Sequence, residues 1–260
     1  MANVATSGNP APGYATHPDY FLDSNVSPKW VCVVFNGETV ADSKRALIMR
    51  ENRHTPVYYF PRDDVRMDLA QSTATHTHCP FKGEASYWML KVGDRSDDDV
   101  MWSYETPYDE ALKFKDHIAF YWNKMDRWYE EDEEIFVHAR DPNVRIDALK
   151  SSRSVKVVHQ GITLADTAQP VLLFETGHRS RYYIPAEDVM MDHLVSSSSE
   201  TACPYKGTAN YWSVKIGDEV IEDLVWTYSD PLPECAAIKG LLCFYDDKVD
   251  GVIVDGTPIT

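Results

Sequence analysis

The chain has too few basic residues and too few cysteines for several common classes of protein. Only 25 Lys and Arg stand against 41 Asp and Glu in 260 residues, which gives a net charge of -16. Because nucleic acids and anionic membranes are bound by clustered basic surfaces, we expect neither a nucleic-acid partner nor a membrane partner. Five cysteines, an odd number, do not suit a disulfide framework. The cysteine content therefore favours a reducing, cytoplasmic setting.

Long apolar runs and helical periodicity are also missing. No apolar run approaches the roughly 20 residues that a membrane-spanning helix needs. The first residues lack the basic start and the apolar core of a secretory signal. Residues 1–27 are rich in Pro, Gly, Ala, Ser and Asn, and this composition predicts a flexible N-terminal leader.

What the chain does have is a repeat at a constant offset of 124 residues, without insertion or deletion. Residues 31–42 align with 155–166, and Cys-Pro-Phe-Lys-Gly at 79–83 returns as Cys-Pro-Tyr-Lys-Gly at 203–207. A gapless repeat of roughly 100 residues is a whole domain rather than one unit of a solenoid. The sequence therefore predicts a duplicated domain.

Each repeat has the pattern of short β-strands. β-Branched runs at 31–35 and 155–159 lead into Asn-Gly and Gln-Gly, and Asn-Gly is a strong hairpin signal. We predict an all-β protein with antiparallel sheets. The predicted boundaries are a leader at 1–27, a first domain at 28–126, an acidic linker at 127–152 and a second domain at 153–260.

Two blocks that occur in both repeats are similar to motifs of the DUF427 family, in its tandem two-domain form. They are Cys-Pro-Phe/Tyr-Lys-Gly-x-Ala-x-Tyr-Trp at 79–88 and 203–212, and Tyr-Tyr-x-Pro-x-x-Asp-Val at 58–65 and 182–189. The resemblance implies two tandem β-tent domains, each made of two small antiparallel sheets that splay around a cleft. Other β-tent families hold zinc with paired Cys-x-x-Cys motifs. This sequence has no Cys-x-x-Cys, so we expect no structural zinc and no other cofactor.

A carboxylate, a phenol and a lysine recur in both repeats. The lysine follows a Cys-Pro-aromatic turn and precedes Gly, so its ammonium lies on a defined loop. The set could bind a carbonyl or carboxylate group and transfer a proton to it. Alternatively, the glutamate and the lysine form a buried bridge that only stabilises the fold. The predicted catalytic residues are Glu51, Tyr59, Lys82, Glu175, Tyr183 and Lys206.

Aromatic, cysteine and arginine side chains complete the predicted clefts. A Tyr-Trp pair on a long strand either fills the core or lines a pocket. The cysteine is either an inert core residue or a nucleophile. Some arginines occur in only one of the two repeats. If one cleft is active and the other only structural, these substitutions would account for the difference. The predicted ligand-binding residues are Tyr87, Trp88, Arg62, Cys79, Tyr211, Trp212, Arg181 and Cys203.

Three functions remain open from the sequence. The first is a protein that binds, or acts by acid/base chemistry on, a small metabolite with a carbonyl or carboxylate group. The second is a protein-interaction module that presents sheet edges and the acidic run 130–134 to a basic partner. The third is a metal site in the first domain only, from His76, His78 and Cys79, because imidazole and thiolate suit zinc or copper. The oligomeric state stays open, and a monomer with pseudo-twofold domains fits the repeat.

Overall fold

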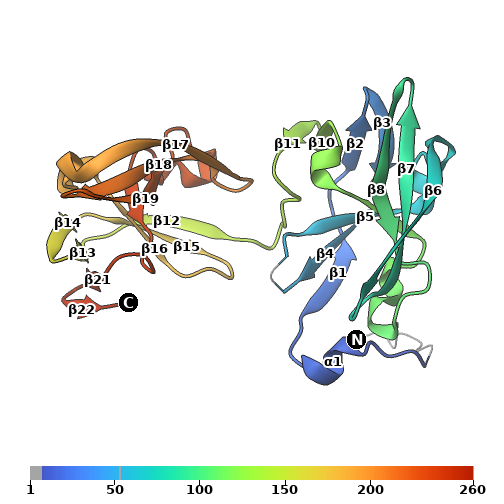
Figure 1. Ribbon diagram of the computed structural model, residues 1–260, viewed down its shortest axis with the longest axis horizontal. Helices are drawn as coiled ribbons and strands as arrows, with labels where there is room; N and C mark the ends of the chain where they lie inside the picture. Colours follow the sequence, from blue (N-terminus) through green and yellow to red (C-terminus); the bar gives the residue numbers. More distant parts are fainter. Residues whose placement is uncertain (1–7, 53, 260) are drawn as a thin grey trace. The chain divides into compact units, whose positions relative to one another are not determined.

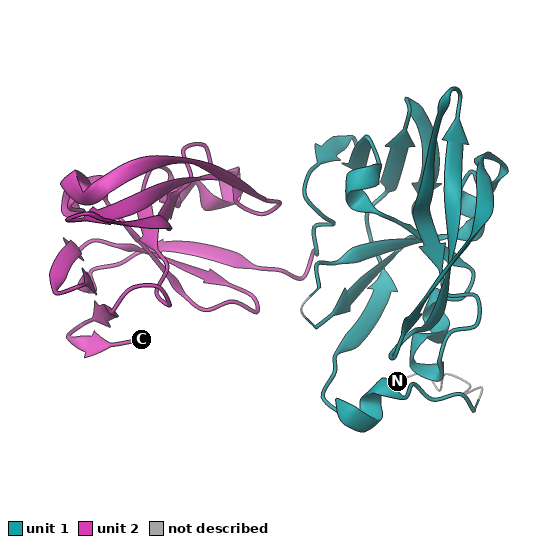
Figure 2. Ribbon diagram, in the orientation of Figure 1, with its two compact units in different colours: residues 1–141 teal, residues 142–260 magenta. Residues whose placement is uncertain are grey.

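The computed structural model describes residues 8–52 and 54–259 of the chain, which divide into two compact units, 1–141 and 142–260 (Figure 2). Each unit contains a seven-stranded and a four-stranded sheet, and the strands of each sheet pair antiparallel (Figure 1). Among the described residues, no helix is long and apolar enough to cross a membrane.

The first unit combines its two sheets with short helical turns. The larger sheet has the order β1 (Leu22–Val26), β4 (Leu47–Glu51), β5 (Val57–Pro61), β9 (His117–Phe120), β8 (Arg95–Ser103), β7 (Gly83–Val92) and β6 (Ala70–Cys79). The smaller sheet has the order β11 (Glu133–Ile135), β10 (Arg127–Glu130), β2 (Val31–Phe35) and β3 (Glu38–Ser43). The helical segments are α1 (Gly13–Thr16), η1 (Arg62–Asp64), η2 (Met67–Leu69), η3 (Asp109–Phe114) and η4 (Trp122–Lys124).

The second unit repeats this plan. Its larger sheet has the order β12 (Ile146–Lys150), β15 (Val171–Glu175), β16 (Arg181–Ile184), β20 (Leu242–Phe244), β19 (Glu219–Thr227), β18 (Gly207–Ile216) and β17 (Leu194–Cys203). Its smaller sheet has the order β14 (Ile162–Thr167), β13 (Val155–His159), β21 (Gly251–Val254) and β22 (Thr257–Pro258). The short helical turns are η5 (Ala186–Asp188), η6 (Met191–His193) and η7 (Pro233–Ile238). The predicted duplicated all-β fold is confirmed.

The turns use residues that tolerate a left-handed backbone. Asn36 and Gly37 have φ of 49° and 79°, and Gln160 and Gly161 have φ of 49° and 73°. Positive φ at both central residues defines the two-residue turn that matches the twist of paired strands. The Asn-Gly and Gln-Gly pairs therefore close the β2–β3 and β13–β14 hairpins.

In each unit, side chains that alternate along the long strands form two apolar clusters, one on each face of the larger sheet. On β7, Trp88 and Leu90 belong to the core cluster shared with β2, whereas Tyr87 belongs to a second cluster with Tyr59 and Tyr104. Successive residues of a strand point to opposite faces of its sheet. The second cluster lies on the face that carries the candidate site.

Two of the predicted boundaries differ from the structure. Within the predicted leader, residues 1–7 lie outside the described residues, but residues 8–27 contain α1 and β1, and β1 pairs with β4. The predicted acidic linker contains β10 and β11, which extend the sheet of β2, and β12, which pairs with β15. Of these strands, β1, β11 and β12 lie at sheet edges, where one face or neither needs to be apolar, so their composition resembles that of a loop.

We predict that residues 142–260 fold without the first unit. The apolar clusters of this unit consist entirely of its own residues, and a domain with its own core can fold alone. The fragment should give a β-sheet circular dichroism spectrum and a cooperative thermal transition. An unfolded fragment, compared with the full-length chain as the control, would contradict this.

Candidate functional site

The predicted glutamate and lysine meet in the first unit. Glu51 is the last residue of β4, and Lys82 lies in the turn between β6 and β7. The Lys82 Nζ atom lies 2.5 Å from both carboxylate oxygens of Glu51, and the two side chains are only 6% and 7% exposed. Gly83 permits this turn, because its φ is 111° and an added Cβ would lie 3.2 Å from the carbonyl oxygen of Thr106.

The second unit contains the same ion pair. The Nζ atom of Lys206 lies 2.6 Å from an oxygen of Glu175, with the side chains 12% and 9% exposed. Each buried charge is compensated by the other, and a buried charge without a partner is strongly destabilising. The recurrence in both units indicates that the pair stabilises the fold, and its position also makes it one wall of a cleft.

In the first unit a third side chain completes the pair. The hydroxyl of Tyr20 donates a hydrogen bond of 2.7 Å to Glu51, and its ring stacks on Phe81 at 3.6 Å with an interplanar angle of 5°. The repeat places Val144 at the position of Tyr20, so the second unit has no such phenol. Tyr20 lies in the predicted leader and was not among the predicted site residues.

Tyr59 and Tyr183 also occupy equivalent positions. The hydroxyl of Tyr59 accepts a hydrogen bond of 3.2 Å from Nε1 of Trp102, and Tyr183 accepts one of 3.1 Å from Trp226. Because each hydroxyl accepts this bond through its oxygen, its own hydrogen stays available for donation. The two tryptophans recur at the repeat offset, and this recurrence is the signal that could have identified them.

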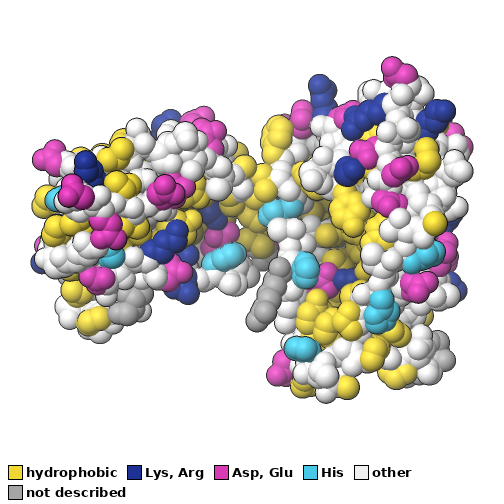
Figure 3. Space-filling model, in the orientation of Figure 1, with side chains coloured by type: hydrophobic (Ala, Val, Ile, Leu, Met, Phe, Trp, Pro, Cys, Tyr) yellow, Lys and Arg dark blue, Asp and Glu magenta, His cyan; other side chains and the backbone are white. Residues whose placement is uncertain are grey.

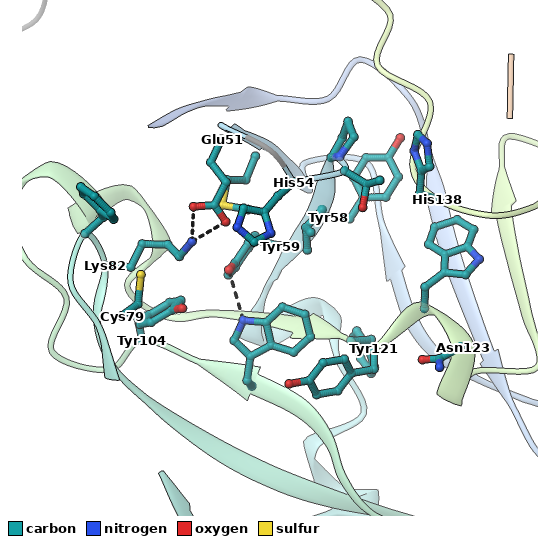
Figure 4. Close-up of a pocket in the computed structure, with 18 of the residues that line it drawn as sticks. Glu51, His54, Tyr58, Tyr59, Cys79, Lys82, Tyr104, Tyr121, Asn123 and His138 are labelled. Carbon is teal, nitrogen blue, oxygen red and sulfur yellow. Dashed lines mark hydrogen bonds and ion pairs between the residues drawn. The ribbon is translucent and has the colours of Figure 1, made fainter. Parts of the chain in front are cut away.

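A cleft of about 670 Å³ opens beside these groups in the first unit (Figure 4). Glu51 and Lys82 lie on the left of the view, Tyr59 and Tyr121 near its centre, and Asn123 and His138 on the right. Figure 3 shows apolar side chains gathered on this face of the unit, with histidines among them. The predicted site residues that line the cleft are Glu51, Tyr59, Cys79, Lys82 and Tyr87. Other lining residues, which were not among the predicted site residues, include Trp102, Tyr104, Tyr121, Trp122, Trp128 and His138.

Burial keeps the phenols of the cleft protonated. It is the main cause that raises the pKa of Tyr59 and Tyr104 far above the ordinary value, and Glu51 adds to both shifts. Burial, followed by a hydrogen bond with Tyr87, raises the pKa of Tyr121 to about 12. These groups are therefore hydrogen-bond donors at neutral pH and not phenolate bases.

Three predicted ligand-binding residues lie away from the cleft. Trp88 is 5% exposed and belongs to the core cluster on the other face of β7 from Tyr87. The Arg62 guanidinium carbon lies 5.2 Å from the centroid of the Trp88 ring and therefore shares this location. Trp212 packs against the corresponding core of the second unit. Strand alternation places Trp88 and Trp212 on the core side of their sheets, and Arg62, in η1, lies over Trp88, so none of the three lines the cleft.

Of the three remaining predicted residues of the second unit, Tyr211 and Arg181 have internal partners. Tyr211 forms a hydrogen bond of 2.8 Å with Thr201, and Cys203 is partly buried at the end of β17. Arg181 forms an ion pair of 2.7 Å with Asp246, which is only 10% exposed, and the cavity beside them is about 10 Å³. Its guanidinium carbon lies 5.4 Å from the Trp226 ring centroid. This part of the second unit is therefore occupied by its own side chains.

The three residues proposed for a metal site do not form one. Nε2 of His78 lies 2.8 Å from the Tyr108 hydroxyl, and Nδ1 of His76 lies 3.6 Å from Glu84. Cys79 follows His78 directly on β6 and so points to the other face of the strand. Across residues 8–52 and 54–259, no three His, Cys, Asp or Glu side chains are grouped so as to hold a metal ion.

The acidic run 130–134 is not uniformly solvated. Glu130 is 7% exposed, accepts a hydrogen bond of 2.8 Å from the hydroxyl of Tyr58 and forms an ion pair with Lys29. The other four acids of the run are exposed at the β10–β11 hairpin. Only these four remain for the predicted contact with a basic partner.

The fold and the site define a class of protein in which one two-sheet domain, with a buried Glu–Lys pair, occurs twice in tandem. The family described as a domain of unknown function, DUF427, matches residues 23–131 and again residues 147–255. The chain belongs to this family, with two copies of its domain. No curated protein matches the chain.

We predict that breaking either buried ion pair destabilises its own domain. Glu51→Gln or Glu175→Gln leaves a buried ammonium without its carboxylate, which typically costs about 3–5 kcal/mol of unfolding free energy. The double replacement Glu51→Gln with Lys82→Met should recover at least half of the loss, because no uncompensated charge remains. Urea unfolding followed by tryptophan fluorescence measures this. Losses below about 1 kcal/mol, the size typical of exposed pairs, would show that the pairs are not buried in solution.

We also predict that alkaline pH destabilises the protein through its buried phenols. The folded-state pKa of Tyr59, Tyr104 and Tyr183 is raised, so the folded state retains protons that the unfolded state loses. Their contribution to stability is complete below the ordinary pKa of about 10 and falls as the pH rises above it. Ultraviolet absorbance of phenolate should therefore show these tyrosines ionising only together with unfolding. Reversible ionisation of every tyrosine near the ordinary pKa, with the fold retained, would contradict the burial.

Proposed function

We propose that the first unit binds a small organic molecule that carries a carbonyl or carboxylate group. The observation that carries the proposal is the aromatic cleft of about 670 Å³. Ligand sites are typically concave, of roughly 300–1,000 Å³, mostly apolar and supplied with a few polar groups. The cleft matches this description in its volume and in its lining.

Hydrogen-bond donors in the cleft support recognition of an oxygen acceptor. The Tyr59 hydroxyl accepts from Trp102 and keeps its own hydrogen for a ligand. Within the described residues, the Tyr104 hydroxyl meets no hydrogen-bond partner, and burial keeps it protonated. Neutral phenols donate to carbonyl and carboxylate oxygens alike.

The Glu51–Lys82 pair supports binding more directly than proton transfer. Both oxygens of Glu51 are bonded to Lys82, and one of them also accepts from Tyr20. An ammonium has three N–H groups, so Lys82 keeps one for a ligand oxygen. Glu51 can act as a base only when a substrate displaces Lys82 and Tyr20, so reversible binding is the function these contacts support best. The five free cysteines support the further proposal that the protein works in the cytoplasm.

We predict saturable binding of benzamide or benzoate, with one site per chain, as measured by isothermal titration calorimetry. The variant Val57→Arg with Trp122→Asp places the residues of the second unit, Arg181 and Asp246, into the first cleft. It should reduce binding at least tenfold, because the new ion pair fills the cleft.

The matched control is Arg62→Ala, which should bind as the wild type does, because Arg62 lies over Trp88 outside the cleft. Thermal melts establish that each variant is folded. Failure of both probes to bind the wild type, or undiminished binding by the folded double variant, would overturn the proposal.

A further inference from the structure

The second unit places its own cations on two aromatic rings. The Arg181 guanidinium carbon lies 5.4 Å from the Trp226 ring centroid, and the Lys248 Nζ atom lies 4.4 Å from that of Tyr245. The two rings contact each other, with centroids 4.5 Å apart and an interplanar angle of 49°. Cations within about 6 Å of an aromatic face are attracted by its quadrupole. The ring pair of the second unit therefore functions as a cation platform that is already occupied.

The first unit has the same rings without the cations. Trp102 and Tyr121 stand at the equivalent positions, with centroids 4.7 Å apart and an interplanar angle of 44°. Val57 replaces Arg181, and Lys124, the equivalent of Lys248, forms an ion pair of 2.8 Å with Asp97. In the described part of the chain, no Lys or Arg lies over either ring.

The exposure of the rings follows from this difference. Trp226 is 7% exposed, whereas Trp102 is partly exposed and Tyr121 is 40% exposed. Both Trp102 and Tyr121 line the open cleft. The first unit thus presents to solvent a platform that the second unit covers with its own side chains.

We propose that the ligand of the first unit carries a quaternary ammonium group, which lies on the rings of Trp102 and Tyr121. This inference rests on the proposed function and names the class of its ligand. The group takes the place that the guanidinium of Arg181 holds in the second unit.

The identity of the neighbouring residue selects a quaternary ammonium over a guanidinium or a primary amine. In the second unit, Asp246 accepts hydrogen bonds from Arg181 and Arg179. Trp122 replaces Asp246 in the first unit, and its ring stacks on Trp128 at 4.3 Å. An N–H group would meet an aromatic surface there and lose a hydrogen bond that water supplies. A quaternary ammonium has no N–H group to satisfy, and aromatic faces are its usual binding surface.

The charges of the site favour a cation with an acceptor at its other end. Glu51 and Lys82 neutralise each other, and the chain as a whole has a net charge of -16. The phenols of Tyr59 and Tyr104 supply donors to a carbonyl group. A ligand that joins a quaternary ammonium to an ester or carboxylate would therefore contact both the rings and the neighbouring phenols.

The test compares acetylcholine with 3,3-dimethylbutyl acetate, which has the same shape but a neutral carbon in place of the nitrogen. Calorimetry is done with the full-length protein in about 1 M salt, where the Debye length is about 3 Å and the net charge of the chain is screened. We expect acetylcholine to bind at least tenfold more tightly than its neutral analogue. Equal or tighter binding of the analogue would overturn the inference.

Variants at the platform separate a cation–π contact from simple apolar contact. Trp102→Phe keeps an aromatic face, whereas Trp102→Leu removes it, and thermal melts confirm that both are folded. The preference for acetylcholine should survive in the first variant and fall to within about threefold in the second. An unchanged preference in folded Trp102→Leu would also overturn the inference.

Failure of the quaternary ammonium inference can be distinguished from failure of the proposed function. If benzamide binds while acetylcholine does not, the quaternary ammonium inference fails and the proposed function stands. If none of the probes binds, both fail.

Discussion

The buried ion pair between the end of β4 and the turn after β6 is the constraint on which both domains depend. Lys82 and Lys206 each follow a Cys-Pro-aromatic turn, and each is bonded to a glutamate that ends an apolar strand. The bond fixes the β6–β7 hairpin, or its β17–β18 counterpart, to the far part of the same sheet. An ammonium and a carboxylate with little access to water cannot separate without a large loss of free energy. The pair therefore sets the position of one wall of the cleft.

On this shared scaffold the two copies differ at a few positions with large physical consequences. Arg181 and Asp246 fill the second unit at the place where Val57 and Trp122 leave the first unit open. The ring pairs underneath keep nearly the same geometry in both. The differences lie in side chains and not in the strands.

The sequence predicted the duplication and the sheet class because these follow from the repeat and from strand patterning, and it offered the buried Glu–Lys bridge as an alternative to a catalytic set. It did not predict which face of β7 carries the cleft, so Trp88 was assigned to the site in place of Trp102. Alternation places neighbouring residues of a strand on opposite faces of the sheet. Which of the two faces is buried in the main core depends on how the two sheets pack against each other, and this packing is not visible in the sequence. The strands β1 and β12 were read as leader and linker because each is a short edge strand within a stretch of largely polar composition. Tyr20 was missed because its stacking on Phe81 joins residues far apart in the chain, which no local pattern reveals.

The central claim is that the first unit holds an open ligand site whose counterpart in the second unit is covered by Arg181. The most direct measurement is a titration with acetylcholine that is followed through the indole N–H resonances of the seven tryptophans by nuclear magnetic resonance. The account predicts saturable shifts for the indoles of Trp102 and Trp122, which line the cleft, and no shift for Trp226. Equal shifts for Trp102 and Trp226, or none for either, would contradict it.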